Sequence, residues 1–540
     1  MRSLGGRIEA RTFYFFALVI ASFAVACSSL LDFDQFEVGA LDDAGSNVTD
    51  TGSPDGGDTP DASDTDDGGC FDPAGFGGRG CWRCAPTNQD EILNACTASD
   101  FVPFDNAARI AGYDPNTPQP PLVDGGPTPP PFDAGAPPPP VDDAGPAPTA
   151  APCPLNLPNP VMILGATGFP MDVIAKAMGS AAPGAGATMY YSEKSSCVGV
   201  ASRILNTPKL SGEIVYYDSA GTARKCTLEE EHPADINLSA LFADSCAGQE
   251  GLSQNVQLPP DVQDLLGPVN PIMLATPKTS TELVISAEAA YKVYGFGAAS
   301  GVAPWTDELY IFRRTASSAN QQTVARSLGL PIGGLRGRDS SGSSNMKNAL
   351  QFSDNPVKTI GISASEIVDI NRDVMKALAF QHFGQKVGFY PDSSPGAFNR
   401  RNVRDGHYFL WIPLHVLVRT VAGDPVAAQN LVLEANGATA TARNAAVKLL
   451  AYVMVNRQEA PVKSVDLFGA LKVVGNVPQC AMRVTRAKEG APLTPFEPSL
   501  RCDCAFEAAS PGETPAGCQS CTESSTCPAS RPTCSFGYCE

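Results

Sequence analysis

One segment of this sequence, LYIFRRTASSANQQTVARSLGL, holds the side chains best suited to bind an anion. It predicts a buried strand over Leu309–Phe312, a polar loop over Arg313–Asn320 and a helix that begins near Ala319. Ser317 and Ser318 stand where they can cap that helix, whose first turn offers free N–H groups and a positive dipole end. An arginine facing those donors would complete a site for a small oxyanion. The same residues also fit a plain serine-capped helix with arginines on a solvated edge.

Other loops repeat this order of an apolar strand, a hydroxyl or acidic side chain, and the start of a helix. In open α/β sheets, ligands bind where such loops gather at the carboxyl ends of the strands. The pattern therefore predicts a cleft lined by convergent hydroxyl and N–H donors. The residues that carry it are Thr167, Ser195, Ser196, Asp244, Ser245, Arg314 and Ser318.

The elements that must position these loops alternate between strands and amphipathic helices, which predicts an α/β sheet with crossover helices. The expected strands include Val161–Leu164, Met189–Ser192, Ile236–Phe242, Pro271–Thr276, Thr359–Ser363 and Val387–Tyr390. The expected helices include Met171–Met178, Glu282–Tyr291, Met346–Phe352, Ile367–Phe383, Pro425–Ala435 and Ala440–Val455.

The charge balance of the chain argues against nucleic acid as a partner. The 540 residues carry a formal net charge of −19, and much of the acidity lies in the Asp-rich linker that follows residue 27. Nucleic-acid binding requires the opposite sign of charge. The 17 cysteines, many of them clustered, indicate an oxidising compartment.

The N-terminus, residues 1–27, has the features of a secretory signal. Arg2, Arg7 and Arg11 precede the apolar run Phe13–Ala26, which is too short to span a bilayer comfortably. Its small residues end at Cys27, as in a bacterial lipoprotein signal, so we expect cleavage before Cys27 and lipidation of its thiol. The chain would then be extracytoplasmic and held at the bacterial membrane by this anchor alone. A plain secretory signal or an uncleaved anchor is the alternative.

Composition divides the rest of the chain into three parts. Residues 28–152 predict a disordered acidic and proline-rich tether that contains a cysteine-rich island at 70–96. Residues 153–478 predict the main α/β domain, and residues 479–540 predict a disulfide-held module. In the island, two disulfides are expected among four cysteines, with a zinc site as the alternative there and in the C-terminal module. The 16 cysteines other than Cys27 can all pair.

Several loops together resemble the phosphate-binding substrate-binding proteins of ABC transporters. Gly165–Pro170 is similar to the turn that opens those proteins, and Ser195–Val200 is similar to their second loop. Asn237–Asp244 falls where the family has a strand ending in Ser-Asp. Arg314–Asn320 keeps the spacing of the family's third loop, although Ala319 and Asn320 replace its glycine and threonine. Later, Gly337–Asn348 followed by Thr359–Ile362 resembles the family's glycine-rich segment and the strand after it.

The resemblance implies a two-lobed type II periplasmic binding protein fold that closes on a ligand. It implies hydrogen bonds to phosphate from Thr167, Ser196 and Ser318, an ion pair from Arg314, and a proton acceptor at Asp244. Phe169, Ser195 and Asn320 are further ligand-binding candidates by their places in the matching loops. The site could also take another oxyanion, an organic ligand or no ligand. Asp244 could instead be a surface residue beside a disulfide, for which Cys226–Cys246 is the expected pair.

The sequence predicts a solute-binding protein rather than an enzyme. It has neither a G-x-S-x-G nor an H-E-x-x-H motif, and its four histidines are scattered. No catalytic residue, metal site or cofactor is therefore expected, and an ABC permease or a cell-surface protein is the expected macromolecular partner. The alternative function is a cell-surface interaction scaffold that keeps the binding fold without transport-linked phosphate binding. A hydrolase would need a histidine within bonding distance of a cleft serine.

Overall fold

The computed structural model describes residues 69–122, 150–180, 187–218, 220–421, 424–426, 440–455, 467–509 and 517–540. The expected signal segment, the expected lipidation site Cys27 and the stretch Asp42–Asp67 lie outside these ranges. Most of the expected proline-rich spacer and residues 427–435 of the expected helix Pro425–Ala435 also lie outside them. No helix among the described residues combines the length and the apolar character needed to cross a membrane.

The first half-sheet consists of five strands in the order β8-β4-β5-β6-β7. The central strand β4 (Pro160–Gly165) is buried along its whole length and runs parallel to β5 (Thr188–Glu193) and β8 (Ile236–Ser239). A hairpin of β6 (Leu210–Tyr217) and β7 (Ala223–His232) continues it. Apolar side chains on both faces of β4 require cover on both sides. Helices α5 (Met171–Ser180) and α13 (Ala440–Met454) contact each other, and α6 (Ser196–Leu205) packs on β4 and β8.

The second half-sheet repeats the parallel arrangement with β13 (Ile360–Ala364), β11 (Ile311–Arg313) and β12 (Arg338–Asp339). Its helices are α7 (Ala287–Phe296), α8 (Ala319–Leu328), α9 (Ser343–Gln351) and α10 (Ser365–Asp369). Alternate residues of β13 face different partners, because Ile360 and Ile362 join the large core cluster while Gly361 meets Met346 of α9. The predicted mixed α/β class is therefore confirmed.

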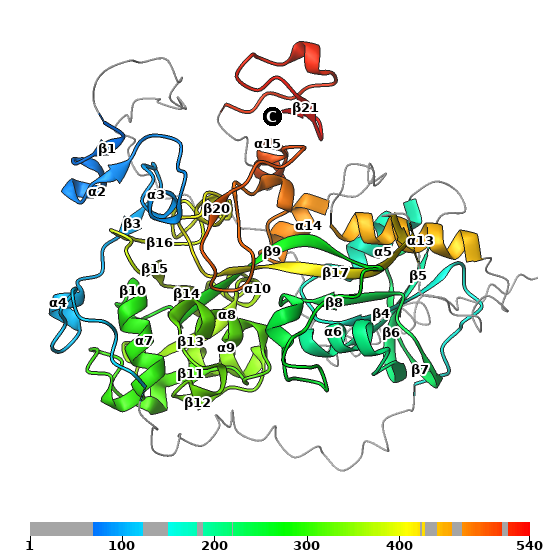
Figure 1. Cartoon of the computed structure of the whole chain (residues 1–540), viewed down its shortest axis with the longest axis horizontal. Helices are drawn as coiled ribbons and strands as arrows, with labels where there is room; N and C mark the ends of the chain where they lie inside the picture. Colours follow the sequence, from blue (N-terminus) through cyan, green and yellow to red (C-terminus); the bar gives the residue numbers. More distant parts are fainter. Residues whose placement is uncertain are drawn as a thin grey trace, which may run out of the picture. The chain divides into compact units, whose positions relative to one another are not determined.

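Two long strands join the half-sheets into one (Figure 1). Strand β9 (Val262–Pro277) and strand β17 (Trp411–Val421) run antiparallel side by side, from the pair Arg419–Val262 to the pair Trp411–Pro271. Strand β17 then pairs with β8 of the first half-sheet, and β9 pairs with β13 of the second. The short strands β18 (Asp424–Val426) and β14 (Met375–Ala377) extend β17 and β9.

Residues 69–122 differ from the prediction of a tether, because the structure packs them into the main domain. The island contains β1 (Phe71–Asp72), α2 (Gly75–Gly78), β2 (Cys81–Trp82) and α3 (Gln89–Leu93). Ile92 and Leu93 of α3 are fully buried in the main core, which the polar sequence around them concealed.

The segment after the island is also part of this body. Strand β3 (Phe101–Val102) completes a small sheet with β10 (Val284–Ser286), β15 (Ala379–Gln381) and β16 (Gly388–Phe389), and α4 (Asn106–Arg109) follows it. The short strands β14 and β15 also correct the prediction of a mostly helical Ile367–Phe383, of which the structure makes only α10 helical.

The C-terminal region likewise begins inside the domain rather than as a separate module. After α14 (Leu467–Val473), the chain forms β19 (Val484–Thr485), β20 (Thr494–Pro495) and α15 (Asp503–Ala508). Val484, Leu493 and Phe506 belong to the main core. Nearer the end of the chain, β21 (Cys534–Ser535) and β22 (Tyr538–Cys539) form a small antiparallel hairpin.

One buried carboxylate of this region reaches the first half-sheet. Glu489 is 2% exposed and accepts hydrogen bonds from the Phe242 N–H, at 2.7 Å, and from the Ser245 hydroxyl. Arg326 of α8 donates to the Ser245 carbonyl oxygen at 3.0 Å. The second half-sheet and the C-terminal segment therefore both hold the turn that follows β8.

All 16 cysteines other than Cys27 are paired, as their even number allowed. The island holds the two expected disulfides, and its alternative of a zinc site does not fit because all four thiols are used. The expected pair Cys226–Cys246 is wrong. Cys226 lies on β7 and bonds Cys153, whereas Cys246 bonds Cys197 at the start of α6. The remaining disulfides are Cys480–Cys502, Cys504–Cys518, Cys521–Cys534 and Cys527–Cys539.

Candidate functional site: a polar cavity at the strand ends

The carboxyl ends of the parallel strands of both half-sheets meet at one cavity of about 250 Å³, which we call the strand-end cavity. Each of its walls is the loop after a parallel strand or the first turn of the helix that follows, except for Asn270 on β9. This is the place where an open α/β sheet presents ligand-binding groups. The lining residues are Ala166, Thr167, Gly168, Lys194, Ser195, Ser196, Ala240, Asn270, Arg314, Thr315, Ser317, Ser318, Ala319, Asn320, Ser343, Ala364 and Glu366.

Six of the eight ligand-binding residues expected from the sequence line this cavity: Thr167, Ser195, Ser196, Arg314, Ser318 and Asn320. The other two do not. Phe169 is 6% exposed and packs in the core of the first half-sheet. Asp244 lies in a short 3₁₀ helix, Ala243–Cys246, beside the Cys197–Cys246 disulfide, so the alternative given for it fits the structure better.

Close backbone packing brings the first two loops together. Gly165 ends β4 with φ +139°, and a Cβ there would lie 2.0 Å from the Leu238 carbonyl oxygen of β8. A Cβ at Gly199 in α6 would lie 2.2 Å from the same oxygen. Both positions therefore require glycine, and the start of α6 can approach the ends of β4 and β8.

The serines at the start of α6 have different tasks. The Ser195 hydroxyl caps α6 by accepting from the Val198 N–H at 3.3 Å. The Ser196 hydroxyl accepts from the Ala240 N–H at 3.0 Å, so its own proton remains for a ligand.

The third loop follows the predicted order of strand, loop and helix, but the strand and the cap differ from the prediction. Leu309 lies in a 3₁₀ helix (Glu308–Tyr310) and is 51% exposed, so the buried strand begins only at Ile311. Strand β11 and helix α8 flank it, and α8 begins at Ala319 as expected. Ser318 occupies the N-cap position, but its side chain makes no capping hydrogen bond. The Ser318 hydroxyl therefore does not occupy the free N–H groups in the first turn of α8. Both this hydroxyl and the first turn line the cavity.

A cation and a carboxyl group complete the lining. Arg314 donates from Nη1 to the Ser343 hydroxyl at 3.3 Å, and its Nε is buried without a hydrogen-bond partner. Glu366 in the first turn of α10 also has a buried oxygen, Oε2, without a partner. Burial raises the pKa of Glu366 to about 7, although the charge of Arg314 opposes this rise. The cavity thus holds the buried guanidinium of Arg314 beside a carboxyl group that can take up or release a proton near neutral pH.

Sequence reasoning missed Lys194, Asn270, Ser343 and Glu366. Glu366 follows strand β13 at the position where other loops of the cavity carry a serine or threonine. This repeated position could have identified Glu366 as a site residue from the sequence. It was overlooked because the segment after it was expected to be one long helix. Asn270 could not be found in this way, because it lies within β9 and reaches the cavity only through the crossing of the two long strands.

Among the described residues, no histidine lines the strand-end cavity, where a serine hydrolase would need one. All four histidines of the sequence lie in the described part of the chain, and none is hydrogen-bonded to a serine. His415 bonds Asp264 at 2.8 Å and is 1% exposed, and His407 contacts the Ala95 carbonyl oxygen at 2.9 Å. Neither residue lines the cavity.

No protein-family model matches the sequence, and no curated protein matches it. Among solved structures, the chain is similar to a protein described as a phosphate ABC transporter substrate-binding protein of Clostridium perfringens, solved with bound phosphate. The identity is 13% and the TM-score 0.36, over 59% of this chain and 99% of that one. An ABC-type phosphate transport receptor of Vibrio cholerae shows 15% identity and a TM-score of 0.33, over 49% and 88%. The OxyR protein of Pseudomonas aeruginosa shows 9% identity and a TM-score of 0.29, over 56% of this chain and 66% of that one. At such scores these likenesses identify no ligand.

Proposed function

We propose that this chain is an extracytoplasmic solute-binding protein that captures a small oxyanion, phosphate first, in the strand-end cavity. The observation that carries the proposal is the convergence of hydroxyls from three separate loops on one cavity with Arg314. Thr167 and Ser196 come from the first half-sheet, whereas Arg314 and Ser318 come from the second. Charge-assisted hydrogen bonds from such donors suit an oxyanion better than a neutral ligand.

The strand order supports a binding-protein arrangement in which two α/β halves, joined by β9 and β17, hold the ligand between them. Signal cleavage and a lipid anchor at Cys27 would place this domain outside the cytoplasm. The alternative of an interaction scaffold predicts an apolar or blocked cleft. The polar lining, with Lys194 and Arg314 as cations, favours solute capture.

The test of this proposal is the binding of inorganic phosphate to the full chain and to Arg314→Ala. A thermal-shift titration and calorimetry would compare phosphate, sulfate and chloride at equal ionic strength. Loss of a charged hydrogen-bond donor costs about 1.5–3 kcal/mol, so we expect Arg314→Ala to weaken phosphate binding by roughly 10- to 150-fold. Arg224→Ala is the matched control, because Arg224 lies on β7 outside the cavity and is exposed. Absence of any oxyanion binding, or equal binding by Arg314→Ala, would remove the proposal in favour of the scaffold.

Glu366 should make the selectivity for phosphate depend on pH. Sulfate carries no proton near neutral pH, so it can meet Glu366 favourably only when the carboxyl group is protonated. Because the pKa of Glu366 is raised to about 7, sulfate affinity should fall by up to about tenfold per pH unit above that value. Phosphate can bring its own proton and donate it to the ionised Glu366, so its affinity should change less.

Calorimetric titration of both anions from about pH 6 to about pH 8.5 checks this expectation. The phosphate-to-sulfate ratio should rise with pH in the natural chain. Glu366→Gln, whose amide has no titratable proton, should show a nearly constant ratio. A ratio that rises equally in Glu366→Gln would assign the pH effect to the anions alone.

A further inference from the structure

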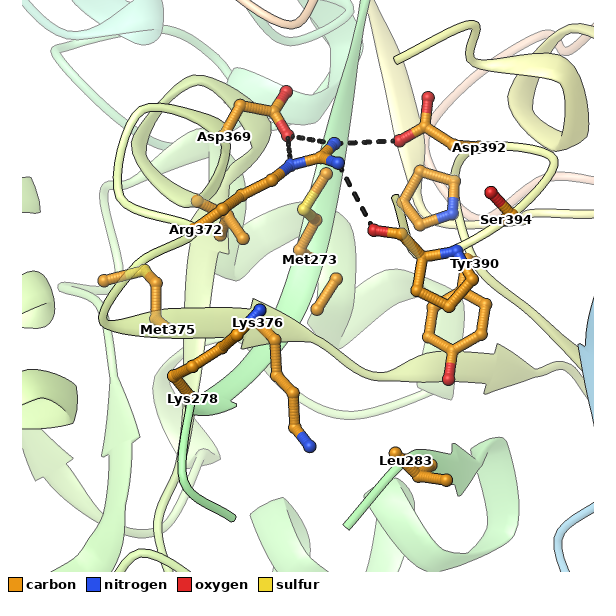
Figure 2. A pocket seen from close by; sticks show the side chains of 14 residues that line it. Met273, Lys278, Leu283, Asp369, Arg372, Met375, Lys376, Tyr390, Asp392 and Ser394 are labelled. Atoms are coloured by element: carbon orange, nitrogen blue, oxygen red, sulfur yellow. Dashed lines mark hydrogen bonds and ion pairs between the residues drawn. The ribbon is translucent and has the colours of Figure 1, made fainter. Parts of the chain in front are cut away.

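A second cavity, of about 130 Å³, lies beside β9, β14 and the loop after β16, and it shares no lining residue with the strand-end cavity (Figure 2). Its apolar walls include Met273 and Met375, which are buried, and Leu283, which is 47% exposed. An apolar cavity of about 150 Å³ holds one benzene molecule. The space therefore suits one ring or a short aliphatic chain.

The acidic side chains of this cavity are already neutralised. Arg372 pairs with Asp369 at 2.7 Å and with Asp392 at 3.1 Å, as Figure 2 shows. Buried Arg400 pairs with both carboxylates as well. Two arginines and two aspartates leave this cluster without net charge. The Nη1 group of Arg372 donates to the carbonyl oxygens of residues 395 and 397, so all three nitrogens of the guanidinium are engaged.

Two lysines of the lining, in contrast, are not held in ion pairs. Within the described ranges, neither Lys278 nor Lys376 forms an ion pair. The Lys376 ammonium group donates to the Ser280 carbonyl oxygen at 2.6 Å, which leaves two of its three protons. The nearby carboxylate of Glu282 is bound by Arg109 at 2.8 Å. Burial and the charge of Lys278 lower the pKa of Lys376, and the charge of Glu282 only partly opposes this.

A polar group that can add specificity stands at the same cavity. Tyr390 is 6% exposed, and none of the hydrogen bonds among the described residues engages its hydroxyl. Figure 2 shows its ring next to the cavity, between the paired aspartate Asp392 and the rim residue Leu283. The cavity therefore combines an apolar interior, two cations that form no ion pair among the described residues, and the hydroxyl of Tyr390.

We propose that this cavity binds a small carboxylate with an apolar body of one ring or a short chain. The carboxylate lies at Lys278 and Lys376, where it relieves the repulsion between the two ammonium groups. The apolar body lies against Met273 and Met375. This site is independent of the strand-end cavity and does not depend on oxyanion capture.

The test uses the full chain and benzoate as the probe. Benzyl alcohol and benzylammonium serve as comparison ligands of similar size that are neutral and cationic. Ligand-observed NMR and calorimetry should show binding in the order benzoate, benzyl alcohol, benzylammonium. Lys376→Met keeps the apolar stem and removes the charge, so benzoate should bind at least about tenfold more weakly while benzyl alcohol is unaffected. Leu283→Trp, which places a larger side chain at the exposed rim, should weaken the binding of both benzoate and benzyl alcohol.

Two controls separate this site from other anion binding. Lys386→Met removes an exposed lysine elsewhere and should leave benzoate affinity unchanged. Arg314→Ala should also leave it unchanged, even where phosphate binding is lost. The proposal is overturned if benzoate does not bind, if benzylammonium binds equally well, or if benzoate binding is lost in Arg314→Ala and retained in Lys376→Met.

Discussion

Replacing Arg404 with methionine is expected to lower the free energy of unfolding by about 3–5 kcal/mol, because it leaves two carboxylates without their main partner. The Arg404 side chain is 3% exposed and bonds Asp503 at 2.8 Å and Glu507 at 2.6 Å. It also donates to the Ala481 carbonyl oxygen at 3.3 Å. These contacts join helix α11 (Arg401–Arg404) to α15, so the loss falls on the attachment of the C-terminal segment.

The control for this prediction is Arg419→Met. Arg419 pairs with Asp261, but their side chains are 37% and 52% exposed. Exposed pairs contribute between about 0 and 1 kcal/mol, so this variant should stay close to the natural chain. Urea unfolding of the oxidised protein, followed by tryptophan fluorescence, gives both midpoints. Equal midpoints for the two variants would mean that burial of the Arg404 pairs adds nothing to stability.

His382 should make the protein lose stability in acid. Its ring stacks on Phe409 with centroids 3.6 Å apart, and it is 6% exposed. Burial, helped by the charge of Arg486, lowers the pKa of His382 to about 3. Between about pH 6.5 and pH 3 the unfolded chain therefore binds a proton that the folded chain does not. In the middle of that window each pH unit costs about 1.4 kcal/mol, and because the slope flattens near both pKa values the whole window costs about 4 kcal/mol.

His382→Phe keeps a ring for the stack and cannot be protonated. Its unfolding free energy should therefore fall less steeply with acid than that of the natural chain, by about 1 kcal/mol per pH unit. Urea unfolding at several pH values measures the two slopes. Phe383→Leu, an apolar change at the next residue, should shift the curve without altering its slope. Parallel curves for His382→Phe and the natural chain would show that this histidine is not the group responsible.

The sequence allowed good prediction where a structure is local. The strand at Val161–Leu164 and the helix that begins at Ala319 follow from apolar periodicity and from serines at strand ends, and both stand in the structure within a few residues. The same local reasoning located Arg314 and Ser196, because strand ends in a parallel sheet lie on a common edge.

Prediction failed where distant segments decide the outcome. Ile92 and Leu93 of the island were visible as apolar residues, but nothing in their surroundings showed which core would bury them. Asp244 matched a family position in spacing, yet it does not line the cavity. Its turn is held by the Cys197–Cys246 disulfide and by the hydrogen bonds that Glu489 accepts from the neighbouring residues, and none of these contacts is local in sequence. Short strands such as β14 contain too few residues for the spacing of their apolar side chains to distinguish a strand from a helix.

The contacts of Glu489 and Arg326 with the turn after β8 have a consequence for the kinetics of ligand exchange. Any motion that separates the two half-sheets must break these contacts, whether or not a ligand is present. Such a barrier slows entry and exit by the same factor and leaves the equilibrium affinity unchanged. For the anion capture proposed above, the residence time would then be long for the affinity, and a Glu489→Gln variant would release and capture the anion faster at an unaltered Kd.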